Sequence, residues 1–179
     1  MKERTGEAFE LGEQLTVLGG KLQPGATAPA FTLDSFDPAA GAMRQIQLSD
    51  SAGQIRLLNI INSLDTPVCH METRRWEKIR ADLPADVVVY TVSMDLPFAQ
   101  ARWQMSENVS HVMLSSHRAE KFGEDYGVLI KEWRLLQRAV LVIDKHDRIV
   151  HAEYVPDQMA EPNYDSTVNA VKEAASADQ

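Results

Sequence analysis

Apolar positions along the chain follow two different periods, which together predict alternating strands and helices. Three uninterrupted apolar runs of strand length, Leu57–Ile61, Val87–Val92 and Ala139–Ile143, are typical of central strands that are buried on both faces. Residues 67–83 instead carry apolar side chains at helical spacing, near one face of a helix. Strands that alternate with helices indicate an α/β layer fold.

The rest of the chain extends this alternation at both ends. Two short segments on either side of Gly12-Glu13 predict a β-hairpin at about residues 7–18. The predicted elements, in chain order, are the strands Glu7–Leu11, Gln14–Leu18, Phe31–Leu33, Met43–Leu48 and Leu57–Ile61, the helix 67–83, the strand Val87–Ser93, a helix from Pro97 to about Ser106, the strand His111–Leu114, the helix Arg118–Tyr126 with Gly127 at its end, the strands Ala139–Ile143 and Ile149–Tyr154, and the helix Tyr164–Ala174.

The length and composition fit one folded domain. The chain has 179 residues, of which 44% are hydrophobic and 25% are charged, an ordinary balance for a globular protein with a full core. No internal repeat, low-complexity segment or linker divides it. We therefore expect a single domain over residues 1–179, with the hairpin at about 7–18 and a frayed tail at 176–179.

The charge and the cysteine content exclude several classes of function. The formal net charge is −8, and the basic clusters Arg74–Arg75 and Lys131–Arg134 are short and diluted by acidic residues, which argues against nucleic acid or an anionic membrane surface as a partner. No segment approaches the roughly 20 apolar residues of a spanning helix, and the charged start lacks an apolar signal region. One cysteine cannot form an intrachain disulfide. These features predict a cytoplasmic globular protein.

The single cysteine lies at the predicted start of a helix, where its reactivity would change. The strand Leu57–Ile61 leads through a polar loop into Thr66-Pro67-Val68-Cys69. Thr66 suits the N-cap, because a threonine hydroxyl there accepts hydrogen bonds from first-turn amides, and Pro67 suits the first helical position. Cys69 then occupies the third position, where free amides and the helix dipole favour a thiolate. The thiolate is the nucleophilic form of cysteine and the form that peroxides oxidise.

Five stretches of the sequence, taken together, point to a known family. They are Gly25-Ala-Thr-Ala-Pro-Ala-Phe-Thr-Leu33, Leu58-Asn-Ile60, Asp65-Thr-Pro-Val-Cys69, Ser93-Met-Asp-Leu-Pro-Phe-Ala-Gln-Ala-Arg102 and Arg138-Ala-Val-Leu-Val-Ile-Asp144. With them the chain resembles the thiol peroxidase branch of the peroxiredoxins, from about Glu7 to Lys172. The resemblance implies a thioredoxin-like fold, with a central mixed sheet flanked by helices, and a homodimer.

The resemblance also implies roles for three residues. Cys69 would attack hydrogen peroxide or a small alkyl hydroperoxide and become a sulfenic acid. Thr66 would hydrogen-bond the cysteine and the peroxide, and Arg138 would support the thiolate and the leaving oxygen. Elementary electrostatics agrees, since a fixed guanidinium stabilises both negative charges. Thiolate displacement on an O–O bond needs no metal, flavin or haem, so no cofactor is expected.

Two departures from the family pattern complicate the assignment of the family's residue roles to this chain. Where the family has a proline three residues before the Asp-Thr pair, this chain has Asn62. Where the family has its resolving cysteine, the chain reads Trp103-Gln104, so that Gln104 stands in the vacated position. The usual intramolecular disulfide is therefore impossible. An external reductant, either a thioredoxin-like protein or a small thiol, would have to reduce the sulfenic acid, or two subunits would pair through Cys69.

Other interpretations remain open at this stage. The loss of both the proline and the resolving cysteine also fits a redox sensor or interaction protein that is oxidised without turning over. A disulfide exchange enzyme of the thioredoxin type is disfavoured, because it needs a first cysteine where Thr66 stands.

The histidines offer weaker candidates for function. The five of them show no metal-ligand spacing, so no metal site is expected. His70 follows Cys69 directly and would point about 100° away around the helix, which argues against a catalytic Cys–His pair.

Overall fold

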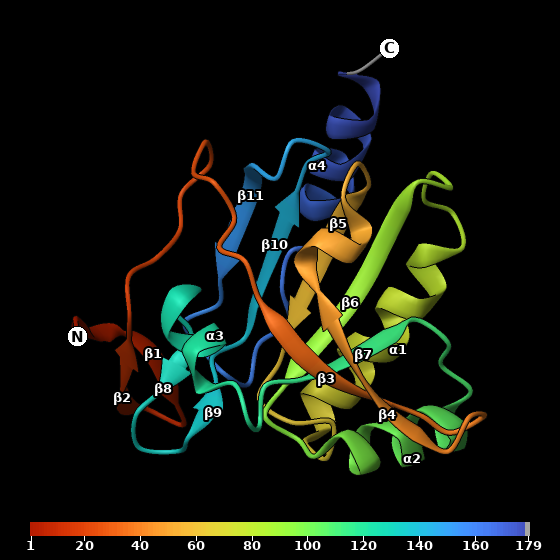
Figure 1. Ribbon diagram of the computed structural model, residues 1–179. Coiled ribbons are helices and arrows are strands. Elements are labelled where there is room, and N and C mark those ends of the chain that lie inside the picture. Colours follow the sequence, from red (N-terminus) through yellow and green to blue (C-terminus); the bar gives the residue numbers. More distant parts are fainter. Residues whose placement is uncertain (178–179) are drawn as a thin grey trace.

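The computed structural model describes residues 1–177 of the chain, and the strands among them form two sheets (Figure 1). The larger sheet has seven strands in the order β11-β10-β5-β6-β7-β3-β4, in which β5, β6 and β7 run parallel and the other neighbours antiparallel. The smaller sheet has four antiparallel strands in the order β1-β2-β8-β9. The strands are β1 Glu3–Glu10, β2 Glu13–Leu18, β3 Thr32–Asp37, β4 Ala42–Gln47, β5 Ile55–Ile60, β6 Val87–Ser93, β7 Val112–Ser115, β8 Leu129–Ile130, β9 Leu135–Leu136, β10 Ala139–Ile143 and β11 Ile149–Tyr154.

The helices cover the larger sheet on both faces. Helices α1 and α4 share one face, where the rings of Trp76 from α1 and Tyr164 from α4 lie 4.9 Å apart. Helix α3 covers the opposite face together with the chain around Phe31. The helices of the described residues are α1 Pro67–Arg80, α2 Pro97–Glu107, α3 Glu120–Asp125 and α4 Tyr164–Ser176, with the short 3₁₀ helix η1 Leu48–Ser51 after β4.

Strand β5 lies in the middle of the larger sheet, and all six of its residues are buried. Ile55 and Leu57 pack toward α1 and α4, whereas Leu58 and Ile60 pack toward the face that α3 covers. Successive side chains of a strand point to opposite faces, so a strand between two layers must be apolar on both. This explains the uninterrupted apolar run, and the strand delivers the chain directly into the loop before Cys69.

Most predicted elements are confirmed, and several agree to the residue. The predicted strands Val87–Ser93, Ala139–Ile143 and Ile149–Tyr154 match β6, β10 and β11. The N-terminal β-hairpin is present, with its turn at Leu11 and Gly12, both of which have positive φ as a two-residue hairpin turn requires. The central mixed sheet flanked by helices is therefore confirmed as the fold class.

Two strands were not predicted from the sequence. Strands β8 and β9 contain two residues each and pair with each other and, through β8, with β2. The intervening segment Lys131–Arg134 was interpreted as a basic cluster, but it is the turn of a second small hairpin. The apolar pairs Leu129-Ile130 and Leu135-Leu136 on either side of a four-residue turn with three charged residues were the available signal.

Some predicted boundaries were wrong. Strand β1 begins at Glu3 rather than Glu7, and α3 begins at Glu120 rather than Arg118. Gly127 follows α3 with a φ of +67°, as a glycine beyond a helix end commonly does. Helix α4 continues to Ser176, so this part of the predicted frayed tail is helical, and residues 178–179 lie outside the described residues.

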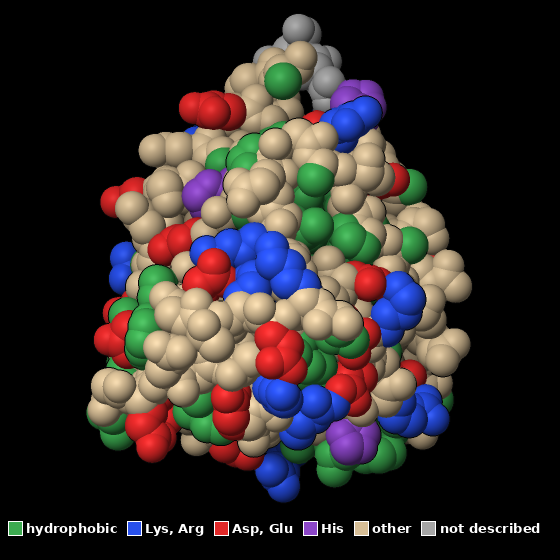
Figure 2. All heavy atoms as spheres, turned by 90° about the vertical axis from the view of Figure 1, so that its left-hand side faces the viewer, with side chains coloured by type: hydrophobic (Ala, Val, Ile, Leu, Met, Phe, Trp, Pro, Cys, Tyr) green, Lys and Arg blue, Asp and Glu red, His purple; other side chains and the backbone are tan. Residues whose placement is uncertain are grey.

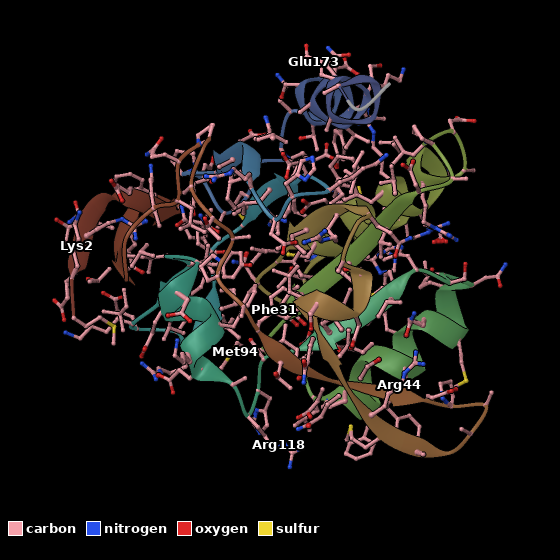
Figure 3. All side chains as sticks on the ribbon, turned by 45° about the horizontal axis from the view of Figure 1, so that its top comes forward. Lys2, Phe31, Arg44, Met94, Arg118 and Glu173 are labelled. Atoms are coloured by element: carbon pink, nitrogen blue, oxygen red, sulfur yellow. The ribbon has the colours of Figure 1, made fainter. Side chains whose placement is uncertain are left out.

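Charged side chains of both signs are distributed over the surface. Figure 2 shows Lys, Arg, Asp and Glu side chains interspersed on the face beside β1 and β2. Figure 3 shows Lys2, Arg118 and Glu173 at the periphery, while Phe31 lies toward the middle, where it is 8% exposed. None of the helices within residues 1–177 combines the length and the apolar character needed to cross a membrane.

Candidate functional site

Cys69 is the third residue of α1 and is fully buried. Pro67 begins the helix and Thr66 occupies the N-cap with an extended backbone, as predicted. The hydroxyl of Thr66 does not cap the helix, however, because it donates to the backbone oxygen of Ser63 at 2.8 Å. The predicted capping role of Thr66 is therefore wrong, and the first-turn amides keep no hydroxyl partner from this residue.

Asp95 fixes the loop that leads into α1. Its carboxylate accepts hydrogen bonds from the Ser63 hydroxyl at 2.7 Å and from the Leu64 amide at 3.0 Å. It also accepts one from the hydroxyl of Ser93, the last residue of β6. Charge-assisted hydrogen bonds of this kind are among the stronger ones in proteins. The loop before Cys69 is thus tied to the end of the neighbouring parallel strand.

The strand pairing brings Arg138 to the same loop. In the antiparallel pair of β10 and β5, Ala139 lies opposite Ile60. Arg138 precedes Ala139, so it lies next to the point where the chain leaves β5 for the loop that contains Asn62. Residues separated by about 70 positions in the sequence therefore meet at one end of the larger sheet.

The buried guanidinium of Arg138 connects the side chains of this site. Its Nη1 lies 3.2 Å from Cys69 Sγ and 2.5 Å from Glu72 Oε2. Its Nη2 donates to the backbone oxygen of Gln158 at 2.7 Å and lies 3.4 Å from Asn62 Oδ1. The structure thus brings the predicted residues Cys69, Arg138 and Asn62 into contact, and it adds Glu72 and Gln158.

Glu72 and Arg138 form a buried ion pair. Burial raises the pKa of Glu72 to about 7, against the opposing effect of the Arg138 charge. Burial would lower the pKa of Arg138, but the negative charges of Glu72 and of an ionised Cys69 raise it. Glu72 stands three residues after Cys69 on the same helical face, a spacing that could have identified it from the sequence.

The shifted pKa of Glu72 predicts a pH dependence of stability. A carboxyl group whose pKa is higher in the folded than in the unfolded protein contributes stability, which is fully present at pH values below its unfolded pKa of 4.5. This contribution is lost as the pH rises through the folded pKa of about 7. From pH 4.5 to pH 8, the free energy of unfolding of the wild type should therefore fall by up to about 3 kcal/mol relative to that of Glu72→Gln. Urea unfolding of both proteins across this range measures the difference, and parallel pH profiles would contradict the expectation.

A pocket of about 270 Å³ opens at the start of α1, beside Val68, although Cys69 itself does not line it. Its walls come from the start of α1, from the small sheet and from the segment after β11. Its lining consists of five apolar residues, Pro67, Val68, Trp133, Leu135 and Met159, and five polar or charged ones, Glu10, Asn62, Thr66, Arg138 and Gln158. The smaller sheet, whose last two strands were not predicted, thus helps to form the entrance.

Gln104 and His70, which the sequence analysis considered, make their hydrogen bonds away from the sulfur of Cys69. Gln104, in the vacated resolving position, donates to the backbone oxygens of Val109 and His111. Trp103 rather than Gln104 packs in the apolar cluster that contains Cys69. His70 accepts a hydrogen bond from Trp103 Nε1 at 3.0 Å and its ring faces that tryptophan, so the expectation that it does not pair with Cys69 agrees with the geometry.

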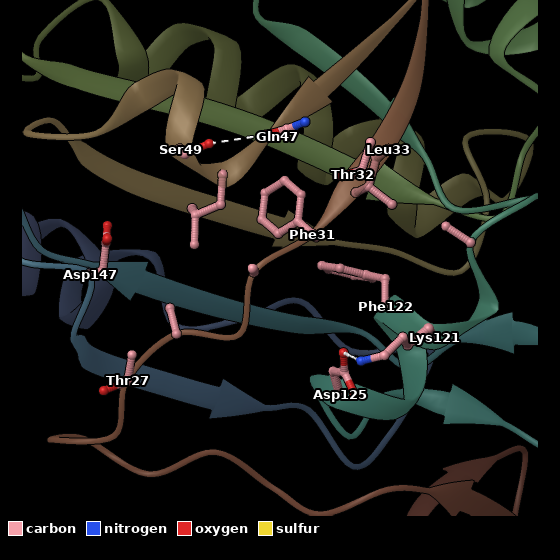
Figure 4. A pocket seen from close by; sticks show the side chains of 14 residues that line it. Thr27, Phe31, Thr32, Leu33, Gln47, Ser49, Lys121, Phe122, Asp125 and Asp147 are labelled. Atoms are coloured by element: carbon pink, nitrogen blue, oxygen red, sulfur yellow. Dashed lines mark hydrogen bonds and ion pairs between the residues drawn. The ribbon is translucent and has the colours of Figure 1, made fainter.

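Other parts of the described chain are less suited to redox chemistry. A larger cavity of about 510 Å³ shares no lining residue with the pocket at the start of α1 (Figure 4). Phe31, Leu33 and Phe122 line it, and Lys121 and Asp125 form an ion pair at its side. Residues 1–177 contain no group of three or more His, Cys, Asp or Glu side chains placed to hold a metal ion.

Comparisons with known proteins show the family of the chain. The model of the Redoxin family matches residues 23–168. Thiol peroxidase of Streptococcus parasanguinis is 44% identical over 163 residues, which are 90% of this chain and 96% of that protein. Thiol peroxidase of Bacillus subtilis (strain 168) is 41% identical over 162 residues, 90% of this chain and 93% of that protein.

Solved structures support the same fold. A peroxiredoxin-like protein from Aquifex aeolicus superimposes with a TM-score of 0.82 and 32% identity, covering 95% of this chain and 98% of that one. A thiol peroxidase from Chromobacterium violaceum gives a TM-score of 0.84 at 19% identity, covering 95% and 97% of the two chains, a likeness of fold alone.

Proposed function

The chain belongs to the Redoxin family and, within it, to the thiol peroxidase branch of the peroxiredoxins, and we propose that it reduces hydroperoxides through Cys69. The observation that supports this proposal most strongly is the 3.2 Å contact between Arg138 Nη1 and the sulfur of the chain's single cysteine at a helix start. A fixed cation and free first-turn amides both favour a thiolate.

The proposed reaction proceeds in two steps. The thiolate of Cys69 attacks one oxygen of the hydroperoxide, the O–O bond breaks, and the leaving alkoxide or hydroxide takes a proton to become an alcohol or water. Cys69 is left as a sulfenic acid. Arg138 would stabilise the thiolate and the charge on the departing oxygen. Its Nε, which has no hydrogen-bond partner among the described residues, leaves one donor for the substrate.

An external thiol would complete the cycle, because residues 1–179 contain no second cysteine. Two equivalents of a small thiol, or one thioredoxin-like dithiol, reduce the sulfenic acid to the thiol and release water while they themselves form a disulfide. Thr66 lines the pocket and is proposed to position the hydroperoxide. No metal, flavin or haem enters either step.

The cellular setting is part of the proposal. A single cysteine suits a reducing compartment, so we place the protein in the cytoplasm. We also propose a homodimer, with support from the large apolar side chains of Leu96, Phe98 and Met105, which are 48%, 57% and 64% exposed. Analytical ultracentrifugation of the chain would test the dimer.

Peroxide consumption with and without a reductant tests the proposed function. We expect the protein to consume hydroperoxide catalytically when dithiothreitol or a thioredoxin system is supplied. Consumption of one equivalent per chain, with no recycling by any thiol, would instead identify a redox sensor or interaction protein. That second candidate is favoured by the full burial of Cys69 and by the absence of a resolving cysteine.

The apolar pocket predicts a preference among hydroperoxides. Pro67, Val68, Trp133, Leu135 and Met159 offer carbon surface that an alkyl or aryl group can bury and that hydrogen peroxide cannot use. We expect kcat/KM for cumene hydroperoxide to exceed that for hydrogen peroxide by about tenfold or more. Steady-state assays with both substrates measure the ratio, and Trp133→Ala should reduce it. Equal values of kcat/KM in the wild type would contradict this prediction.

A further inference from the structure

Two amide side chains, Asn62 and Gln158, are buried against the reacting residues. They are only 4% and 2% exposed. Asn62 belongs to the loop after β5, and Gln158 lies in the irregular segment between β11 and α4. Amides carry a donor end and an acceptor end, so their orientation decides the sign of the charge that each presents to Cys69 and Arg138.

The contacts of Gln158 allow only one orientation of its amide. Its Nε2 donates to the backbone oxygens of Val155 at 2.9 Å and Pro156 at 3.0 Å. Its Oε1 accepts from the backbone N–H of Arg138 at 2.9 Å. A reversed amide would set oxygen against two carbonyls and NH₂ against an N–H, so the surrounding backbone fixes Oε1 toward Arg138 and Asn62.

Gln158 and the backbone of Leu136 together fix the orientation of Asn62. The Nδ2 of Asn62 donates to the backbone oxygen of Leu136 at 2.6 Å and to Gln158 Oε1 at 3.1 Å. Both of these partners are acceptors only, so the oxygen of Asn62 cannot take the place of its NH₂ group. Asn62 Oδ1 therefore faces the other way, 3.4 Å from Arg138 Nη2 and 3.9 Å from Cys69 Sγ.

This geometry places two opposing influences on the sulfur. Arg138 favours the thiolate, whereas the oxygen of Asn62 can accept a hydrogen bond only from a protonated thiol and faces a thiolate with partial negative charge. Helix α1 contributes Glu72, which pairs with Arg138, and His70, which faces Trp103. The remaining neighbours in the cluster around the sulfur are apolar: Ile61, Leu64, Trp103, Val109 and Met113.

We propose that Asn62 is a hydrogen-bond acceptor for the Cys69 thiol, held in that orientation by Gln158 and by the backbone oxygen of Leu136, and that this contact retains part of Cys69 in its protonated form. The inference rests on the proposed function, since it concerns the nucleophile of that reaction. Asn62 touches the reacting sulfur, and Gln158 is a positioning residue. The contact limits the fraction of nucleophilic thiolate at a given pH, and it does so with the residue that replaces the proline of the family pattern.

A direct titration of the thiolate tests the role of Asn62. The chain has one cysteine, so thiolate absorbance at 240 nm, followed from pH 4 to pH 9 in buffer without peroxide, reports Cys69 alone. Asn62→Leu removes the acceptor at similar size and should move the midpoint down by about one pH unit. Asn62→Asp keeps the acceptor and adds a negative charge, so its midpoint should move up by about one unit. Equal midpoints, or shifts of the same sign in both variants, would overturn the proposal.

Gln158→Leu tests the positioning role. It removes one of the two acceptors that hold the Asn62 NH₂ group and leaves the backbone oxygen of Leu136 as the other, so the Asn62 oxygen is held less firmly toward the sulfur and the midpoint should fall, by less than in Asn62→Leu. The control is Gln137→Leu, which removes another buried glutamine whose amide donates to the backbone oxygens of Glu7 and Val155 and, among the described residues, forms no hydrogen bond with Cys69 or Asn62. A midpoint at or above that of the wild type in Gln158→Leu would overturn the role of Gln158.

Separate measurements report on the folding of the variants, on the Asn62 contact and on the proposed function. Circular dichroism identifies any variant that does not fold, and Asn62→Ala, which also removes the acceptor and should also lower the midpoint, then replaces Asn62→Leu. The titration contains no peroxide, so its outcome concerns the Asn62 contact alone. Peroxide consumption by the wild type, measured apart, decides the proposed function.

Discussion

Replacing Cys69 by serine is expected to abolish hydroperoxide reduction, with a residual rate no higher than that of the buffer and reductant. A serine hydroxyl keeps the shape of the side chain but is not ionised near neutral pH, so the reacting nucleophile is lost. No other cysteine in the sequence can take over. Stopped-flow measurement of peroxide consumption in the presence of dithiothreitol checks this expectation.

The control is another sulfur atom on the same helix. Met71 is 54% exposed on α1 and lies outside the pocket lining, so Met71→Leu removes an oxidisable thioether without touching the site. This variant should keep the wild-type rate. Full activity in Cys69→Ser, or loss of activity in Met71→Leu alone, would contradict the assignment of Cys69 as the nucleophile.

Arg138→Met is expected to have the second-largest effect, and it should act on both rate and stability. Loss of a donor that stabilises developing negative charge commonly costs about 10²–10³ in rate. The same change leaves Glu72 buried without its partner, and breaking a buried ion pair destabilises a protein by about 3–5 kcal/mol. Single-turnover oxidation of Cys69 and urea unfolding measure the two effects.

A double variant separates these effects. In Arg138→Met combined with Glu72→Leu, apolar groups replace the whole ion pair, which is often neutral for stability. We expect the free energy of unfolding to recover toward the wild-type value while the oxidation rate stays low. Recovery of the rate along with stability would show that Arg138 acts only on the fold.

Local rules explain why the place of Cys69 at the start of a helix could be predicted from the sequence. A buried apolar strand, a polar loop and Thr66-Pro67 set the helix start, and the third helical position then belongs to Cys69. Arg138 was identified from the family resemblance, and the register of β10 on β5 explains physically why it lies beside the loop that leads to Cys69. The wrong detail was the hydroxyl of Thr66, because Ser63 offers a backbone oxygen that no periodicity reveals.

The supporting residues depend on contacts between distant segments, and these leave little trace in a single sequence. Gln158 lies in an irregular segment with no periodicity, and its place beside Asn62 follows from the path of the chain after β11. The strands β8 and β9 have only two residues each, so their apolar pairs are a weak signal, and the pairing of β8 with β2 is a tertiary contact. The single-domain interpretation of residues 1–179 stays a prediction.

The full burial of Cys69 has a consequence for how fast the protein could be recycled. The sulfur of a protein reductant must approach the sulfur of Cys69 in line with the bond that breaks, which a completely covered atom does not permit. The first turn of α1 must therefore open before each reduction. The recycling rate then equals the reductant's intrinsic rate multiplied by the fraction of molecules that are open. Substitutions that make this turn more flexible would raise the rate of recycling and lower the rate of oxidation, so the flexibility of the same few residues affects the two half-reactions in opposite directions.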